Sequence, residues 1–564
     1  MGRDDIPGAH TEEVSSARPK QADLLIKLAE ACDLYHAPDG TSFADVAVKD
    51  HRETWSTRSK GFRRWLVRRY YEATHGAPSS EAVNSALAII EAKAQFDGAE
   101  RTVHVRVAGL GDRLFIDLAD SEWRSVEIKA QGWRIIDRPP VRFRRATGML
   151  PLPSPAEGGA LGELRRLINV QDDRDVVLII AWLLAALRNR GPYPVLELVG
   201  EQGSAKSFHA AMLRALVDPN TVALRAPPRD DRDLYIAATN GHVIALDNLS
   251  SMPPWLSDAL CRLSTGGGFA TRQLYSDTEE VLLDAMRLII LTAIEDVVTR
   301  GDLADRSMQM RLAPIIEERR RPEREIWADF ETARPRILGA LLDAVAVGLR
   351  DLGKTRLDRL PRMADFAVWT TACEGALWRR GTFAAAYYAN RVEMDETVIE
   401  ADTVATAVRS LVAECSTWTG TAQELLAALV AILGEPAAKA KAWPTTPRAL
   451  SGRLRRAAPT LRRVGISIVF GKRRSKERPI TIKAEQGAIR ASQPSSPSLW
   501  EGLGGFPGGS RGAGDDRRGA GTVLENLSEF AADDSRDGRD GVSSLFSGAA
   551  APAPGCPKHK RITL

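Results

Sequence analysis

The most constraining feature of the sequence is an apolar run that leads through a glycine-rich loop into a helical stretch. The run spans residues 195–199, the loop at 200–207 reads GEQGSAKS, and helical periodicity continues to about residue 217. This order places backbone N–H groups at a helix N-terminus, where they bind phosphate, with a lysine for the β and γ phosphates and a hydroxyl for Mg²⁺. We therefore expect a phosphate-binding loop. Its expected ligands are Gly200, Gly203, Ser204, Ala205, Lys206 and Ser207.

Ala205 departs from the usual motif, because glycine normally precedes the lysine. Alanine is the smallest replacement and is compatible with the same loop, whereas the alternative interpretation is a turn into an ordinary helix. A second apolar run, residues 241–246, ends in an acid, Asp247. An acid at that place can hold Mg²⁺. ATP and Mg²⁺ are thus the expected cofactors, with Ser207 and Asp247 as metal ligands and Lys206 and Asp247 in catalytic roles.

The base that would activate water is left open by the sequence. The residue after Asp247 is Asn248, whereas many ATPases of this type carry a second acid there to polarise the attacking water. Glu201 in the loop and Asp258 farther along are candidates for this role. The alternative is that both are solvated surface acids.

An arginine follows a third apolar run, which spans residues 285–293 and carries Thr292 as a possible polar sensor. Arg306 ends the segment RGDLADR and precedes the expected strand at 307–313. An arginine at this point in the order can reach the γ-phosphate bound by a neighbouring subunit and stabilise transition-state charge. The alternative is a surface ion pair with Asp302 or Asp305.

The order of these motifs resembles the AAA+ class, and more narrowly the superfamily 3 helicases and the primase-helicases of phages and poxviruses. Residues 260–275 add TGGG followed by RQLY, and in those helicases such a stretch forms a hairpin that faces single-stranded DNA in a ring channel. The resemblance implies that Arg272 contacts phosphate and Tyr275 stacks on a base. The alternative is a glycine-rich surface turn with Tyr275 in the core.

A second resemblance covers residues 40–485 and concerns ATP-binding proteins of bacterial phages and integrated mobile elements. It rests on stretches such as 141–145, VRFRR, and 361–366, PRMADF. Together the resemblances imply an α/β fold with a P-loop AAA+ ATPase core. They also imply a helicase-like ATP hydrolase, working as a homo-oligomeric ring in DNA replication of a phage or mobile element, with other replication proteins as further partners.

Length and composition limit the number and kind of domains that the chain can form. At 564 residues, with 44% hydrophobic and 27% charged residues, the chain should form several ordinary globular domains. The longest apolar run, residues 176–187, is too short to span a membrane and predicts a buried helix; with the polar N-terminus it favours a cytoplasmic protein without membrane contact. The five scattered cysteines, with no CxxC, indicate neither a disulfide framework nor a zinc finger.

Pattern changes along the chain predict the domain boundaries. The expected order is a disordered N-terminus (1–20), an N-terminal α+β domain with an antiparallel meander (21–145), a Pro/Gly-rich linker (146–170), the ATPase domain (171–318), a helical subdomain (319–418), a winged-helix-like module (419–485) and a disordered tail (486–564).

DNA binding must come from local clusters, because the net charge is only +4. Residues 443–483 contain 12 Lys/Arg and one acid. A helix start at Thr446-Pro447 and a basic hairpin at 466–483 resemble a winged helix, which places its helix in the major groove of duplex DNA; the alternative is a solvated charged face. The residues expected to contact DNA here are Arg448, Arg453, Arg455, Arg456, Lys472, Arg473, Arg474 and Lys476.

A second basic cluster, residues 52–71, is predicted to be one helix that interleaves Lys/Arg with aromatic residues. Its aromatic residues belong either to a nucleic-acid surface or to a core with arginines snorkelling around it. For the whole chain, three functions remain open. They are a DNA-translocating motor, a weakly hydrolysing nucleotide-switched scaffold or loader, which Asn248 favours, and a DNA-binding regulator with a vestigial loop.

Overall fold

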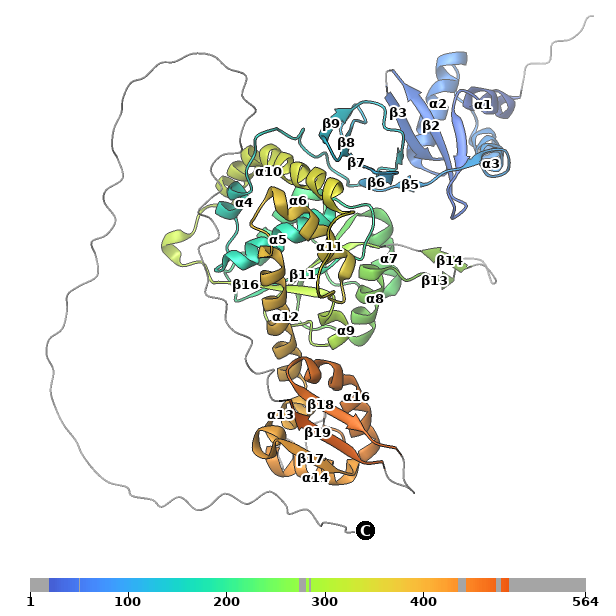
Figure 1. The fold of residues 1–564 in the computed structure, drawn as a ribbon. Coiled ribbons are helices and arrows are strands. Elements are labelled where there is room, and N and C mark those ends of the chain that lie inside the picture. Colours follow the sequence, from blue (N-terminus) through green and yellow to red (C-terminus); the bar gives the residue numbers. More distant parts are fainter. Residues whose placement is uncertain are drawn as a thin grey trace, which may run out of the picture.

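The computed structural model describes residues 20–49, 51–272, 280–283, 286–434, 443–472 and 478–485. The two segments predicted to be disordered lie outside these ranges, apart from Lys20. The fold is a mixed α/β arrangement with several separate sheets. Figure 1 shows an N-terminal part, a central part around a parallel sheet, and a C-terminal part joined to the centre by one long helix.

The N-terminal part packs three helices against a small sheet with the order β3-β2-β1-β4. Its elements are α1 Gln21–Ala29, β1 Asp33–His36, β2 Ser42–Val48, β3 His51–Ser56, α2 Lys60–Thr74, α3 Ser80–Phe96 and β4 Ala99–Glu100. The prediction of one helix over 52–71 is wrong in its first part, because residues 51–56 pair antiparallel with β2. The helix begins only after Ser59, whose Oγ accepts a hydrogen bond from the Phe62 N–H at 3.1 Å.

The predicted antiparallel meander is confirmed, with the order β6-β7-β8-β9. Its strands are β6 Val107–Leu110, β7 Arg113–Asp117, β8 Ser125–Lys129 and β9 Gly132–Ile136, and beside it β5 Val103–His104 pairs in parallel with β10 Arg142–Phe143. The meander packs on the long helix α10, Glu323–Asp351, and Trp133 Nε1 donates to Asp343 Oδ1 at 2.9 Å. Its apolar side chains therefore share one hydrophobic cluster with the central part.

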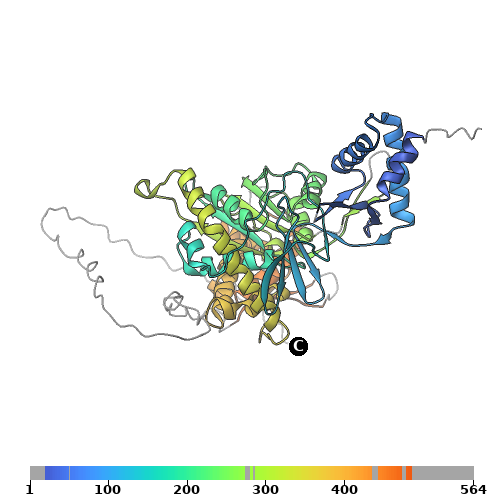
Figure 2. The same ribbon diagram turned by 90° about the horizontal axis from the view of Figure 1, so that it is seen from above.

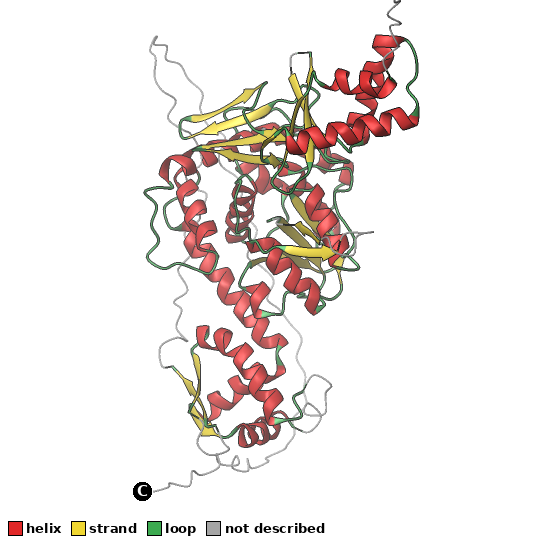
Figure 3. Ribbon diagram, turned by 90° about the vertical axis from the view of Figure 1, so that its right-hand side faces the viewer, coloured by secondary structure: helices red, strands yellow, loops and turns green. Residues whose placement is uncertain are grey.

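The central sheet is entirely parallel, with the order β12-β15-β11-β16. Its strands are β11 Val195–Gly200, β12 Val243–Leu249, β15 Leu288–Ala293 and β16 Ser307–Leu312. One face is covered by α5 Asp173–Ala186, α6 Lys206–Val217 and α10, and the other by α7 Asp231–Asn240, α8 Pro254–Thr265 and α9 Gly301–Ala304. Figure 3 shows these strands between the helices.

The apolar run at 176–187 forms most of α5, and its side chains are buried as predicted. No helix in the described ranges is long and apolar enough to cross a membrane. The remaining elements of the centre are α4 Gly162–Leu167, the hairpin strands β13 Phe269–Arg272 and β14 Glu280–Leu283, two 3₁₀ turns at Glu317–Arg319 and Glu374–Ala376, and the helices α11 Ala364–Cys373 and α12 Thr382–Ala401.

The C-terminal module, which we define as residues 403–485, has its own core and a sheet with the order β17-β19-β18. It contains α13 Thr403–Cys415, β17 Thr417–Gly420, α14 Ala422–Leu433, α16 Pro447–Arg463, β18 Ile466–Phe470 and β19 Ile480–Ala484. The helix start is as predicted, since Thr446 Oγ1 accepts from the Ala449 N–H at 3.2 Å. The helix continues through Pro459 to Arg463, although a proline inside a helix removes one backbone hydrogen bond.

Candidate functional site

The glycine-rich loop connects the end of β11 to the start of α6, which begins at Lys206. The Lys206 ammonium folds across the loop: Nζ donates to the Gly200 carbonyl at 2.7 Å and to the Glu201 carbonyl at 2.8 Å, and lies 3.4 Å from Ser204 Oγ. Burial lowers the pKa of Lys206, although Asp247 opposes this shift. The strand, loop and helix predicted from the sequence are confirmed, and the lysine lies inside the curve of the loop.

Two residues of the loop adopt left-handed backbone conformations, Gly203 with φ +87° and Ala205 with φ +62°. Glycine adopts this region freely, whereas for alanine it costs roughly 1–2 kcal/mol. The unusual Ala205 therefore occupies the position at which the fold itself favours glycine. The loop adopts the curved path despite the substitution.

Two residues that the sequence did not predict form hydrogen bonds to the backbone carbonyl groups of the loop. Asn169 Nδ2 donates to the Ser204 carbonyl at 3.3 Å and to the Ala313 carbonyl at 2.6 Å. His209 Nδ1 donates to the Ala205 carbonyl at 2.6 Å, and its Nε2 accepts from the Asn169 N–H at 2.8 Å. Burial lowers the pKa of His209, which fits this neutral tautomer. Asn169 lies 31 positions before the loop, so no local pattern reveals it.

Ser207 and Asp247, the expected metal ligands, lie together at the carboxyl edge of the sheet. Asp247 Oδ1 accepts from Ser207 Oγ at 2.7 Å and from Thr292 Oγ1 at 2.6 Å, and Thr292 Oγ1 accepts from the Asn248 N–H at 2.8 Å. Such oxygen donors suit Mg²⁺, which is held by one or two protein oxygens together with phosphates and water. Within the described ranges no cluster of three or more His, Cys, Asp or Glu could hold a metal.

The candidate bases form no hydrogen bond with Ser207 or Asp247 at the carboxyl edge of the sheet among the described residues. Asn248 has φ +56° and an exposed side chain, and Glu201 is exposed. Asp258 forms an ion pair with Arg300 at 2.9 Å on the surface of α8. Asp258 is thus an exposed acid paired with an arginine. Among the described residues, no hydrogen bond or ion pair places a second acid beside Asp247.

Arg306 lies at the opposite edge of the sheet from the loop. Its carbonyl accepts from the Val195 N–H at 2.9 Å, at the start of β11, whereas the loop follows the end of that strand. Six strand positions correspond to about 20 Å, so Arg306 cannot reach the loop of its own chain. Its Nη1 donates to the Asp302 carbonyl at 2.6 Å, and among the described residues it forms no ion pair with Asp302 or Asp305.

The expected DNA-binding residues fall into three groups. Arg272 ends β13 of the hairpin, while Tyr275, Arg473, Arg474 and Lys476 lie outside the described ranges. Exposed side chains on the C-terminal module are Arg448, Arg455, Arg456 and Lys472. Arg453 is half-buried and pairs with Asp402 at 3.3 Å, and Arg455 lies over the Phe470 ring at 4.9 Å.

Two protein-family models match parts of the chain. Residues 161–396 match the family model described as "Actinomycete integrative conjugative element replication protein", and residues 404–497 match "AICE RepA C-terminal domain". No curated protein matches the chain. Among solved structures, "The apo structure of NrS-1 C terminal region (305-718)" and "The A form apo structure of NrS-1 C terminal region-CTR(305-718)" are similar at 10% and 11% identity, each with a TM-score of 0.39 and with 83% of this chain and 100% of the other covered.

Proposed function

Because the chain belongs to the replication proteins of actinomycete integrative conjugative elements, we propose that it is an ATP-dependent DNA-binding motor, a helicase-like ATPase that serves replication of the element. The observation that carries this proposal is the hydrogen-bonded group of Ser207, Asp247 and Thr292 beside the glycine-rich loop. A loop lysine, a loop hydroxyl and a strand-end acid are the residues that ATP with Mg²⁺ requires.

In this proposal the central part is a P-loop AAA+ core, and each residue has a defined task. Lys206 exchanges its loop carbonyls for the β and γ phosphates, and Ser207 and Asp247 hold Mg²⁺, which neutralises phosphate charge when bound. Arg306 lies at the opposite edge of the sheet from its own loop, which suits an arginine that completes a neighbour's site in trans. A homo-oligomeric ring follows from that role, because each loop then needs the adjacent subunit.

DNA binding is assigned to two regions. The β13–β14 hairpin with Arg272 and Tyr275 is proposed to face single-stranded DNA, and the C-terminal module is proposed to bind duplex DNA as a winged-helix-like unit. Its α16 presents exposed arginines, and the β18–β19 pair supplies the adjoining hairpin. Binding that depends on such phosphate contacts weakens steeply with salt.

A second function, the weakly hydrolysing nucleotide-switched scaffold or loader, is favoured by one observation. The backbone of Asn248 is turned into the left-handed region while its N–H is tied to Thr292. Its side chain is thereby exposed rather than held over the site. With no acid in this position, ATP binding without rapid turnover is the expected behaviour.

Hydrolysis with and without single-stranded DNA decides between these functions. The measurement uses the full chain at low salt with Mg²⁺, as wild type, Lys206→Ala and Arg306→Ala. A motor requires DNA-stimulated hydrolysis that both substitutions reduce by at least about 100-fold, since an arginine finger contributes roughly 10³–10⁵ to kcat in GTPases and the loop lysine binds the same phosphates. ATP binding with negligible turnover in the wild type would overturn the motor and support the scaffold.

A further inference from the structure

A cationic stripe runs along the exposed face of α2, in the N-terminal part that neither family model covers. The side chains at positions 60, 63, 64, 67, 68 and 71 recur at three- and four-residue spacing, so they share one helix face about 16 Å long. The opposite face, with Phe62, Leu66 and Tyr70, is buried in the domain core. The helical part of the basic cluster predicted at 52–71 thus has one face in the core and one face on the surface.

The stripe borders a hollow of about 640 Å³ between α2 and the segment Gly76–Pro78. Its lining contains four cations and no acid. The lining residues are Lys60, Arg63, Arg64, Val67, Arg68, Tyr71, Gly76, Ala77 and Pro78. The lining thus combines these four cations with the apolar side chains of Val67, Ala77 and Pro78.

The charge of this hollow is largely uncompensated. Arg68 pairs with Glu72 at 2.9 Å, whereas Lys60, Arg63 and Arg64 form no ion pair with any described residue. Arg63 donates instead to the neutral Asn84 Oδ1 at 2.9 Å, which fixes its position without neutralising it. Three exposed full charges therefore lie within about one helical turn of one another.

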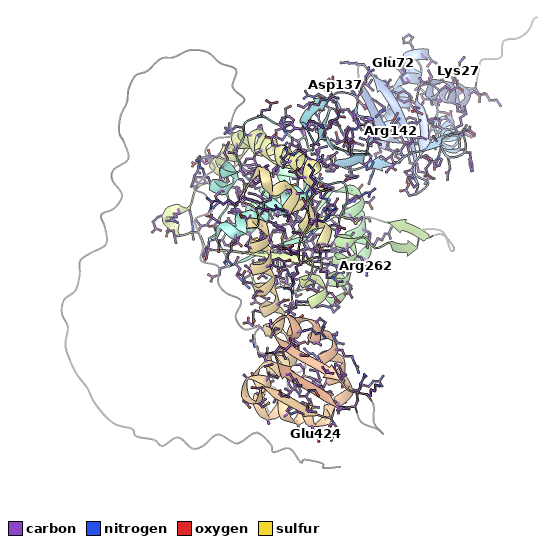
Figure 4. All side chains as sticks on the ribbon, viewed as in Figure 1. Lys27, Glu72, Asp137, Arg142, Arg262 and Glu424 are labelled. Atoms are coloured by element: carbon purple, nitrogen blue, oxygen red, sulfur yellow. The ribbon has the colours of Figure 1, made fainter. Side chains whose placement is uncertain are left out.

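Tyr71 adds an aromatic surface at one end of the stripe. Its side chain is 58% exposed, and its ring meets the His75 ring edge-on at 6.1 Å. His75 closes α2 in a left-handed conformation with φ +55°, so the chain turns back there and holds its ring against Tyr71. Figure 4 labels Glu72, the next residue, on the outer part of the N-terminal region, and Figure 2 shows these helices standing clear of the central part.

We propose that this α2 groove binds single-stranded DNA. Cations that track phosphates beside an exposed aromatic ring are the recognition pattern of single strands, because unpaired bases can stack whereas a duplex hides its base faces. The apolar side chains of Val67, Ala77 and Pro78 in the lining offer a surface to the apolar faces of bases. The inference needs the replication role of the chain but no ATP hydrolysis, so it can fail or succeed independently of the motor.

The first test measures salt dependence with the full chain and no nucleotide. Binding of a fluorescent oligo-dT is followed by anisotropy between 50 and 200 mM KCl for wild type and for Lys60→Gln/Arg63→Gln/Arg64→Gln. Removing three phosphate contacts should make the slope of log K against log salt less negative by about 2, since each contributes about 0.7. The matched control is Arg359→Gln/Arg362→Gln/Arg379→Gln, which removes equal charge from exposed positions elsewhere and should keep the wild-type slope.

The second test concerns the stacking surface. Tyr71→Ala should weaken oligo-dT binding about 5- to 150-fold, the equivalent of one lost stack, while Tyr71→Phe and the exposed-aromatic control Phe96→Ala should bind like wild type. Photocrosslinking to an iododeoxyuridine oligonucleotide should mark the peptide that contains Tyr71. The proposal would be overturned by an unchanged slope in the triple variant or by an unmarked Tyr71 peptide. It would also be overturned if the variants lost binding to duplex DNA and to polyglutamate as much as they lost binding to oligo-dT.

Discussion

At the scale of single residues, the backbone of Ala205 adopts a conformation that favours glycine over the alanine that is present. Its φ of +62° predicts the stability order Gly ≥ Ala > Val. Ala205→Gly should raise the free energy of unfolding by up to about 1 kcal/mol, since relieved strain is partly offset by the freedom that glycine gains in the unfolded chain. Ala205→Val should lower it by about 1–2 kcal/mol, because a β-branched side chain fits this region worst. Thermal unfolding with and without ATP measures the series, and equal stability of all three would contradict the strained loop.

Glu197 is a buried acid in the centre of β11 that no sequence pattern indicated as special. Its Oε1 accepts from the Val297 and Val298 N–H groups at 3.2 and 3.1 Å, and Oε2 accepts from Gln309 Nε2 at 2.9 Å. Burial raises its pKa to about 7, although these hydrogen bonds oppose the shift and Asp296 adds to it. The glutamate thereby ties the loop strand to the segment that leads to Arg300 and Arg306.

The raised pKa predicts how stability depends on pH. Between about pH 4.5 and 7 the folded protein keeps a proton that the unfolded chain releases, so this contribution to stability is present at low pH and is lost as pH rises to about 7. The loss amounts to roughly 3 kcal/mol. Glu197→Gln carries no ionisable group, so its stability relative to wild type should improve by this amount from pH 5 to pH 8. A difference in denaturation midpoint that stays constant with pH would contradict the assignment.

At the scale of elements, periodicity predicted most of the strands and helices, while contacts between distant segments remained hidden. The strands of the central sheet and the meander follow from apolar runs and turn residues. The β3 strand and α2 carry similar basic and aromatic residues, so the sequence pattern predicts one helix over both, although Ser59 between them is an N-cap signal. The four residues of β17 have no strand pattern of their own, because the strand is defined by pairing with β19, which lies some 60 residues later.

The candidate site likewise contains residues that the sequence predicts and contacts that it does not. The loop and Asp247 are visible as motifs, whereas the bond from Thr292 to Asp247 spans 45 positions and exists only once β12 and β15 are neighbours. The continuation of α16 through Pro459 had no local signal either. The helix is held by apolar contacts on both sides of the proline, from Leu454 to Leu461, and packing of this kind overrides a single missing N–H.

The arginines of α16 are of two kinds: some are exposed and available for DNA, and others form ion pairs that stabilise the fold. Arg448 and Arg456 are exposed and form no ion pair with the described residues, whereas Arg453 pairs with Asp402. Arg448→Gln/Arg456→Gln should reduce the salt slope for duplex binding by about 1.8, at about 0.9 per phosphate. Arg453→Gln should leave that slope near the wild-type value and lower stability by up to about 1 kcal/mol. Anisotropy titrations over a salt series check this, and an equal loss with Arg453→Gln would contradict the division.

At the scale of the whole molecule, the C-terminal module is fastened to the centre next to the proposed finger. Arg463, at the end of α16, binds Asp395 of α12 through two bonds of 2.7 Å and reaches Asp305 at 3.0 Å. Asp305 is the residue before Arg306, and Arg391 also pairs with it at 3.2 Å. Figure 1 shows α12 running from the central sheet to the C-terminal module. A displacement of α16 would therefore be transmitted directly to the segment that carries Arg306.

This connection predicts that Arg463 links DNA binding to turnover without taking part in either. Arg463→Ala should lower the DNA stimulation of ATP hydrolysis about 5-fold, the lower end of typical coupling between sites, while basal hydrolysis and duplex binding stay at wild-type values. Arg391 still pairs with both carboxylates, so the variant should fold. Arg463→Lys should fall between the two, because an ammonium cannot reproduce the two-pronged contact with Asp395. The control is Arg462→Ala, an exposed neighbour on the same helix, which should behave like wild type. A parallel loss of basal and stimulated rates would instead show that Arg463 only holds the fold together, and the route from α16 to Arg306 would have to be abandoned.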